Sequence, residues 1–204
     1  MRNNSEIKAF ALESMNGKWV YGIQVVALSA ALCVVPEIPK YFMDEHSAAY
    51  VLWHILTGIL VCAIPLGIAT CFLDVARHSD YSCARVFTAF RSTRFFFKIV
   101  LMELLKSTII ALWSLLLIVP GILKYYSYSM AELIITDHLE YSPFQALAES
   151  KKMMYGHRME LFRLQLAFLP WLLLTLLTIG IASLWVSPYY NTAKSKFYLE
   201  LKRK

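Results

Sequence analysis

The sequence predicts an all-α polytopic membrane bundle, with six transmembrane helices arranged as three hairpins and an amphipathic interfacial helix before each. Three observations predict this fold: apolar composition, an internal repeat, and the placement of basic residues. Of the 204 residues, 58% are hydrophobic and 17% are charged, whereas soluble domains have about 45–50% and about 25%. Crossing a hydrocarbon core of about 30 Å takes roughly 17–25 residues. Several of the apolar runs reach that length; the runs cover 19–35, 51–73, 99–119, 122–135 and 161–186.

The repeat has a period of sixty residues. Tyr81-Ser82 begins a polar, helix-patterned stretch that leads into an apolar run, which ends at Val119-Pro120-Gly121. Sixty residues later, Tyr141-Ser142 begins a similar stretch, whose apolar run ends at Ile179-Gly180. Such periodicity indicates one structural unit used more than once. We therefore expect a single integral membrane domain over residues 1–204, with hairpin units at about 1–75, 76–138 and 139–204.

The basic residues predict how these hairpins are oriented. Nearly all of the 20 Lys and Arg residues lie in segments 1–18, 74–98, 137–163 and the tail from 194, whereas segment 36–50 contains only Lys40. Cytoplasmic loops are enriched in Lys and Arg, so these four segments and both termini are expected in the cytoplasm. Outward and returning crossings then pair as 19–35 with 51–73, 99–119 with 121–136, and 161–179 with 181–196. The expected outer turns include Pro120-Gly121 and the vicinity of Gly180. The first apolar run begins only at Trp19, so we expect an N-terminus that is retained rather than cleaved.

The segment before the third hairpin has the clearest local signal for a helix. Ser142 is a favourable N-cap, Pro143 suits the first helical position, and Gln145 completes a capping box. We expect this helix, like those before the other hairpins, to lie in the inner membrane interface with its cations at the level of the headgroups.

Several short motifs resemble a known family. They are Ile118-Val119-Pro120-Gly121-Ile122, Tyr126-Ser127-Tyr128-Ser129-Met130-Ala131 and Glu149-Ser150-Lys151-Lys152-Met153-Met154-Tyr155-Gly156-His157. The chain is similar here to the bacterial integral membrane proteins catalogued as domain of unknown function 975, most strongly over residues 95–204. The resemblance implies a multi-pass protein of the bacterial plasma membrane. It carries no established activity and no catalytic residues.

Ionisable residues inside apolar runs are the first candidates for a functional site, because such residues are costly in a membrane. Glu103 and Lys106 are three residues apart on the third expected crossing, and Glu132 lies on the fourth. Counted from the turn at about 1.5 Å per residue, Lys106 and Glu132 are at similar depths, roughly 21 and 17 Å. They are interpreted either as an intramembrane polar network for an ion or charged headgroup, or as a network that only fixes the hairpin. Snorkelling of the side chains to the interface is a third interpretation.

A second candidate site is aromatic. Tyr125, Tyr128, Tyr190 and Asn191 lie shortly after the two outer turns and are candidates for lining a polar cavity. The alternative is an aromatic belt with hydrogen bonds between helices, which is common in membrane bundles.

A third candidate set is basic. Arg85, Arg91, Arg94 and Lys98 precede the third expected crossing. They are interpreted either as a site for anionic lipid headgroups or as the general positive charge of a cytoplasmic segment.

No motif for catalysis, metal binding or cofactor binding is recognisable. The sequence contains no GxSxG, HExxH or P-loop motif. The four cysteines form no CxxC pair and are expected to be free thiols. We therefore expect no enzymatic activity, no cofactor, no metal and no nucleic-acid partner.

Two functional classes remain open. The first is a non-catalytic accessory or scaffold component that engages membrane lipids, through anionic headgroups at the cytoplasmic face, or a partner membrane protein. The second is a small transporter or flippase of an amphipathic or anionic substrate, because repeated hairpins are typical of transporters.

Overall fold

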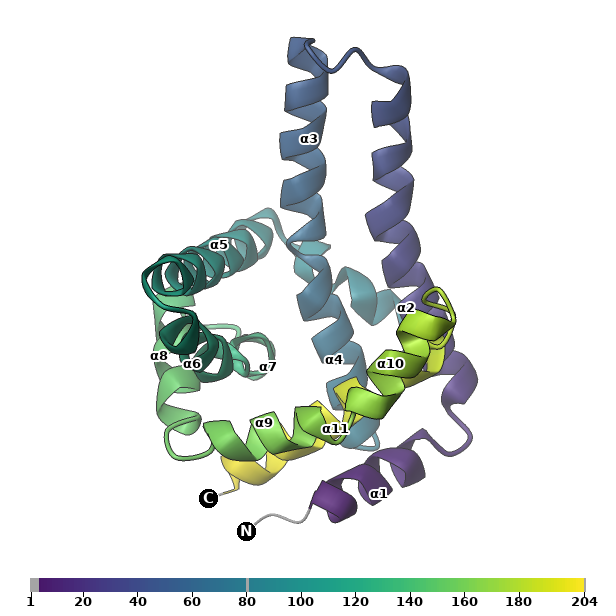
Figure 1. Ribbon diagram of the computed structural model, residues 1–204, viewed down its shortest axis with the longest axis vertical. Helices are drawn as coiled ribbons and strands as arrows, with labels where there is room; N and C mark the ends of the chain where they lie inside the picture. Colours follow the sequence, from purple (N-terminus) through teal and green to yellow (C-terminus); the bar gives the residue numbers. More distant parts are fainter. Residues whose placement is uncertain (1–3, 80, 204) are drawn as a thin grey trace.

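The computed structural model describes residues 4–79 and 81–203. Every regular element in this part of the chain is a helix (Figure 1), so the all-α fold class is confirmed. The extreme terminal residues 1–3 and 204, on which the expected placement of both termini depends, lie outside the described residues.

The first unit is a tall hairpin. Helix α1 (Asn4–Met15) precedes α2 (Trp19–Val34), which continues as the 3-10 helix η1 (Val35–Phe42). The chain returns through α3 (Ala48–Val61) and α4 (Ile64–Ala76), and α2 and α3 stand side by side in Figure 1. The Trp53 indole N–H donates to the carbonyl of Pro36, 2.8 Å away, and fastens the far end of the hairpin.

The stretch that begins at Tyr81-Ser82 is helical, as its sequence pattern predicted. The Ser82 side chain accepts a hydrogen bond from Ala84 N–H at the start of η2 (Cys83–Arg91), and α5 (Thr93–Leu116) follows. The turn after α5 lies at Leu117, whose backbone is extended, three residues earlier than expected. Gly121 lies within α6 (Ile118–Tyr128) and packs on α5, where an added Cβ would meet Ser114 Oγ at 2.1 Å. The glycine therefore serves close helix packing rather than the turn.

The expected returning crossing over 121–136 is divided in the structure. Helix α6 ends at Tyr128, and the short α7 (Ala131–Asp137) follows after a break. Ser150 closes this break from a different helix: its hydroxyl accepts from Met130 N–H at 3.2 Å and donates to the Ser127 carbonyl at 2.9 Å. A buried side chain thus satisfies backbone groups that a continuous helix would pair internally.

The third unit is also interrupted. Helix α8 (Pro143–Met153) begins with the predicted capping box between Ser142 and Gln145. Helices α9 (Arg158–Leu166) and α10 (Leu169–Leu177) follow and are bent by 43° relative to each other. A turn at Gly180, whose φ is +87°, leads into α11 (Ser183–Lys202). The expected turn near Gly180 is therefore present.

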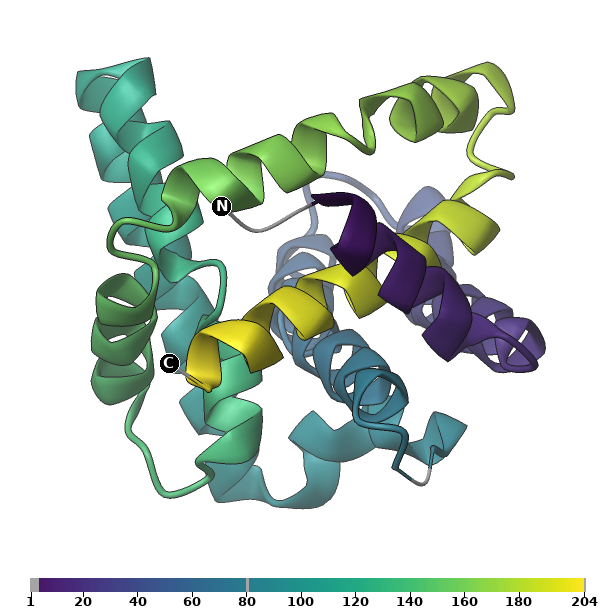
Figure 2. The ribbon, with the colours of Figure 1, turned by 90° about the horizontal axis from the view of Figure 1, so that it is seen from below.

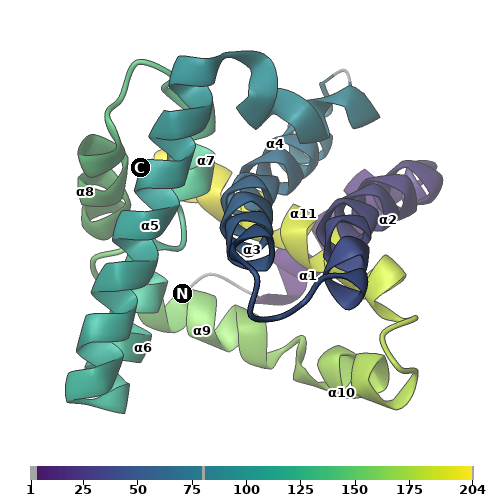
Figure 3. The same cartoon turned by 90° about the horizontal axis from the view of Figure 1, so that it is seen from above.

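Within the described residues, three segments are long and apolar enough to cross a membrane: Trp19–Phe42, Ala48–Ala76 and Thr93–Leu116. The bent pair of α9 and α10 would make a fourth if it forms one broken span. The arrangement of six crossings is therefore not confirmed. Viewed along the first hairpin, α5, α9 and α10 lie across its axis rather than parallel to it (Figure 3).

The core forms where α4, α7 and α11 meet. It includes Leu73, Leu133, Phe168, Phe197 and Tyr198, each at most 1% exposed. Helix α11 runs through the middle of the molecule between α1 and α4 (Figure 2). In contrast, α10 has no buried residue, so its leucines are available to face hydrocarbon.

Candidate functional site

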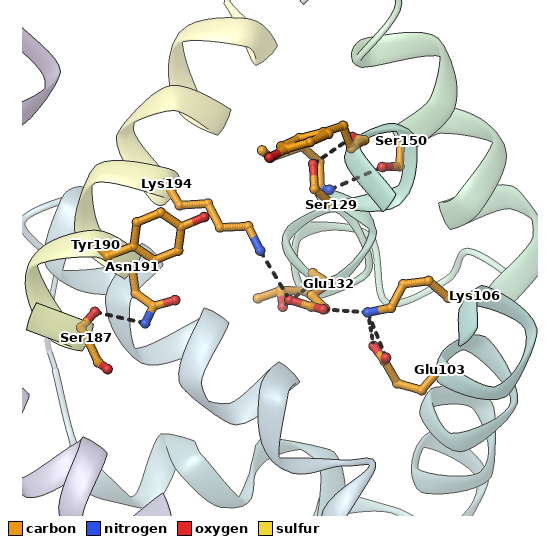
Figure 4. Close-up of polar contacts among 12 residues, drawn as sticks. Glu103, Lys106, Ser129, Glu132, Ser150, Ser187, Tyr190, Asn191 and Lys194 are labelled. Atoms are coloured by element: carbon orange, nitrogen blue, oxygen red, sulfur yellow. Dashed lines mark hydrogen bonds and ion pairs between the residues drawn. The ribbon is translucent and has the colours of Figure 1, made fainter. Parts of the chain in front are cut away.

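The three charged residues predicted to meet inside the protein do so. Lys106 Nζ of α5 lies 2.7 Å from Glu103 of the same helix and 2.7 Å from Glu132 of α7 (Figure 4). Glu132 is also 3.6 Å from Lys194 of α11, a residue that the sequence pattern had placed in the cytoplasmic tail. We call these four residues, Glu103, Lys106, Glu132 and Lys194, the inner charge network.

The charges of the inner charge network balance one another. The network contains two carboxylates and two ammonium groups, and every member has an oppositely charged neighbour. All four side chains are at most 19% exposed. The sequence could have indicated that Lys194 faces the other helices, because it follows Tyr190 by four residues and that spacing places both on one face of a helix.

The four residues predicted to line one polar cavity are divided by the structure. Tyr190 borders an apolar cavity of about 360 Å³ beside α9 and α10. Asn191 borders a separate cavity of about 160 Å³, together with Glu132 and Lys194. Neither Tyr125 nor Tyr128 lines either cavity. Tyr125 is half exposed and Tyr128 is buried.

A hydrogen-bonded chain replaces the expected set of tyrosines. The Tyr126 hydroxyl donates to Gln165 Oε1, and Gln165 Nε2 donates to the Tyr190 hydroxyl at 2.8 Å. Tyr126 comes from α6, Gln165 from α9 and Tyr190 from α11, so the chain joins the second and third units. The sequence signal for Gln165 was its position as an isolated polar residue inside the last apolar run.

The predicted basic set is also dispersed. Arg85 pairs with Asp74 of α4, with Nε 3.2 Å from Oδ2, and Lys98 donates to the carbonyl of Leu139 at 2.6 Å. Arg91 and Arg94 are exposed. Arg91 lines a cavity of about 370 Å³ at the junction of η2 and α5. Two of the four basic residues therefore hold the fold together, and two face outward.

A second charged cluster had not been predicted. Asp137, at the end of α7, accepts hydrogen bonds from Arg77 at 2.6 Å, from Tyr198 at 2.8 Å and from Lys202 at 2.7 Å. We call these four residues the Asp137 cluster. Arg77 lies five residues before Ser82 and Asp137 five residues before Ser142, so they are sixty residues apart, which is the period of the repeat.

The contacts in the Asp137 cluster shift the pKa values of Asp137 and Tyr198. Burial alone raises the pKa of Asp137, but the hydrogen bonds from Arg77, Lys202 and Tyr198 outweigh it and hold the pKa below its ordinary value. Burial, together with the hydrogen bond to the Asp137 carboxylate, raises the pKa of Tyr198. The cluster is therefore built around a carboxylate at neutral pH.

No group of three or more His, Cys, Asp or Glu residues in the described part of the chain is arranged to hold a metal ion. The four cysteines are free thiols. The polar groups described above are engaged mainly with one another, and such closed sets are typical of contacts between helices.

Residues 115–204 match the family model described as Protein of unknown function (DUF975). The resemblance stated from the sequence motifs is thus confirmed over this part of the chain. The match includes Glu132, Tyr190, Asn191 and Lys194 but begins after Glu103 and Lys106. No curated protein and no solved structure matches the chain.

Proposed function

We propose that the protein is a non-catalytic, multi-pass component of the bacterial plasma membrane that binds anionic lipid headgroups at the cytoplasmic face. In this role it acts as an accessory or scaffold for a partner membrane protein. The main support for this function is a cavity of about 370 Å³ at the start of α5. It is lined by Thr88, Arg91, Ser92, Phe95 and Leu139.

The chemistry of this cavity suits a phosphate ester. Arg91 supplies an exposed guanidinium that can bind two phosphate oxygens at once. The Ser92 side chain makes no capping hydrogen bond to α5, which leaves its hydroxyl available. The first amide groups and the dipole of α5 also favour an anion. Farther along α5, Phe97, Leu101 and Leu104 are exposed at helical spacing and can be followed by an acyl chain.

The pairing of charges supports a scaffold over a transporter. The inner charge network neutralises itself, so it offers no uncompensated charge to a substrate. A small transporter or flippase is the second candidate function. The cavity beside Glu132, Asn191 and Lys194 favours it, but its volume of about 160 Å³ is below the roughly 300–1,000 Å³ of typical ligand pockets.

Lipid retention in nanodiscs tests the proposed function. The protein is reconstituted in equal amounts of phosphatidylglycerol and phosphatidylcholine, re-extracted in mild detergent, and its bound lipids are identified by native mass spectrometry. We expect phosphatidylglycerol to be enriched, and the double variant Arg91→Gln, Arg94→Gln to lose that enrichment.

The matched control is Lys151→Gln, Lys152→Gln, which removes the same charge from the exposed end of α8. Equal loss in both double variants would show that general positive charge, rather than the α5 cavity, attracts the lipid. A protein that instead moves labelled lipid between leaflets, and stops doing so when Asn191 is replaced by Leu, would support the transporter.

The six-crossing topology with both termini in the cytoplasm belongs to the same proposal. Reporter tags at the N-terminus, after residue 140 and at the C-terminus are expected to score as cytoplasmic, and a tag near Asp44 as external. An external C-terminus would remove the sixth crossing.

A further inference from the structure

Two apolar cavities adjoin along α9 and α10, and together we call them the groove. One part of the groove, which we call the upper cavity, has a volume of about 360 Å³, lies between α9, α10 and α11, and includes Leu166 and Leu169. The lower part of the groove is a cavity of about 350 Å³ between α6 and α9. Tyr126 and Phe162 line both cavities, with ring centroids 5.9 Å apart, so the two parts adjoin at this aromatic pair.

The polar groups in the middle of the groove are already satisfied. Tyr126, Gln165 and Tyr190 form the hydrogen-bonded chain described above. They do not require polar partners from an occupant, and the remaining lining of the upper cavity is almost entirely hydrophobic. An apolar chain therefore fits the groove better than a polar solute.

The lower end of the groove has the opposite character. Arg158 lines it, and the Nε atom of Arg158 is buried and has no hydrogen-bond partner in the described part of the chain. A buried guanidinium N–H without an acceptor is unfavourable, and an anion is the acceptor that matches its charge. The groove thus presents a cation at one end of an apolar path.

The length of the path suits one acyl chain. From Arg158 to Leu169 the helices advance about 17 Å at about 1.5 Å per residue. One lipid tail extends across half of a hydrocarbon core of about 30 Å, or about 15 Å.

From these observations we propose that the groove binds a single-chain anionic amphiphile, with its carboxylate or phosphate at Arg158 and its acyl chain along Phe162, Leu166 and Leu169. This site is separate from the cavity at the start of α5, so it goes beyond the proposed function and stands without it.

Photo-crosslinking tests the proposal on the full chain in phosphatidylcholine nanodiscs. Two probes are compared: palmitate with a diazirine in its tail, and the corresponding uncharged palmitamide. We expect palmitate to label α9 and α10, and palmitamide to label them about tenfold less, since a hydrogen-bonded charge pair is lost. This contrast uses the unmodified protein and does not depend on any variant folding.

Variants then locate the two ends of the ligand. Arg158→Gln is expected to lower palmitate labelling about tenfold, whereas Arg163→Gln, on the same helix but outside the groove, leaves it unchanged. Leu169→Trp fills the upper cavity and is expected to abolish labelling of α10. Thermal unfolding of each variant shows that the fold is retained.

Equal labelling by palmitate and palmitamide, or equal loss in Arg158→Gln and Arg163→Gln, would overturn the proposal. So would a photoreactive amino acid at position 166 that captures a protein instead of lipid in cell membranes, which would assign the groove to a partner. Arg91 and Arg94 do not line the groove, so Arg91→Gln, Arg94→Gln is expected to leave palmitate labelling unchanged. Failure here is therefore distinguishable from failure of the headgroup site at α5.

Discussion

The inner charge network and the Asp137 cluster both join α7 to α11, but they do so in different surroundings. In the inner charge network, Lys106 and Lys194 are 17% and 19% exposed, so neither cation has ready access to water. In the Asp137 cluster the carboxylate is 5% exposed, whereas Arg77 and Lys202 are 34% and 42% exposed. The first set is buried as a whole, and the second surrounds one buried acid with hydrated bases.

This difference determines what each cluster contributes to stability. In a buried ion pair, the attraction between the charges offsets little more than the free energy lost by removing them from water. Breaking the pair, however, leaves a charge that water cannot reach. A partly exposed base that loses its acid is rehydrated, so the loss is smaller. The two clusters should therefore respond very differently to the loss of one member.

The largest effect is expected for Lys106→Met, which leaves Glu103 without a cation and Glu132 with only the longer contact to Lys194. We expect a loss of about 3–5 kcal/mol in the free energy of unfolding, seen as a large fall in the thermal midpoint in mild detergent.

The control for this variant removes the whole network. The quadruple variant Glu103→Gln, Lys106→Met, Glu132→Gln, Lys194→Met should recover much of the loss, because no unpaired charge remains. Lys194 must be included, since a triple variant would leave its ammonium group facing a neutral amide at position 132. If Lys106→Met leaves the midpoint unchanged, the ammonium group of Lys106 reaches water and the network is not buried.

A smaller effect is expected for Asp137→Asn. This change weakens three hydrogen bonds to a carboxylate, and we expect a loss of about 2 kcal/mol in unfolding free energy. Arg203→Gln, an exposed change near the same end of α11, serves as the control and should have almost no effect. A loss as large as that of Lys106→Met would contradict the distinction drawn between the two clusters.

The Asp137 cluster also predicts a dependence on acid. The pKa of Asp137 in the folded protein is below the ordinary value, so folding stabilises the charged form. That contribution is fully present above the unfolded pKa of about 4 and is lost as pH falls through the folded pKa. Thermal midpoints measured from about pH 5 to pH 2 should fall more steeply for the unmodified protein than for Asp137→Asn. Parallel curves would show that Asp137 does not contribute.

The smallest effect is expected at the helix caps. Ser142→Ala removes the N-cap of α8 and should lower the free energy of unfolding by about 1 kcal/mol. Single cysteines at Gln145 and Glu149 should react with a membrane-impermeant thiol reagent applied from the cytoplasm, whereas one at the buried Leu147 should not. Equal reaction at all three positions would show that α8 is not docked on its neighbours.

Local signals allowed several parts of the structure to be predicted. The first hairpin follows from two long apolar runs, and the start of α8 follows from Ser142, Pro143 and Gln145. Lys106 and Glu132 were predicted to meet because counting residues from the turn placed them at similar depths. That prediction still holds when the turn lies a few residues from its expected position. The prediction of one cavity lined by Tyr125, Tyr128, Tyr190 and Asn191 was wrong. It required all four side chains to face the same space, and that depends on how each helix is rotated about its axis, which position in the sequence does not define.

The sequence by itself determined the helical class, the apolar spans and the capped helix starts, because each depends on neighbouring residues within one or two turns. The tertiary structure decided where the later helices are interrupted and which charges meet. The break between α6 and α7 depends on a hydroxyl from Ser150, and the pairing of Glu132 with Lys194 joins residues far apart in the chain. Such contacts arise only when distant segments pack, since a buried polar group is satisfied by whichever element the fold places beside it.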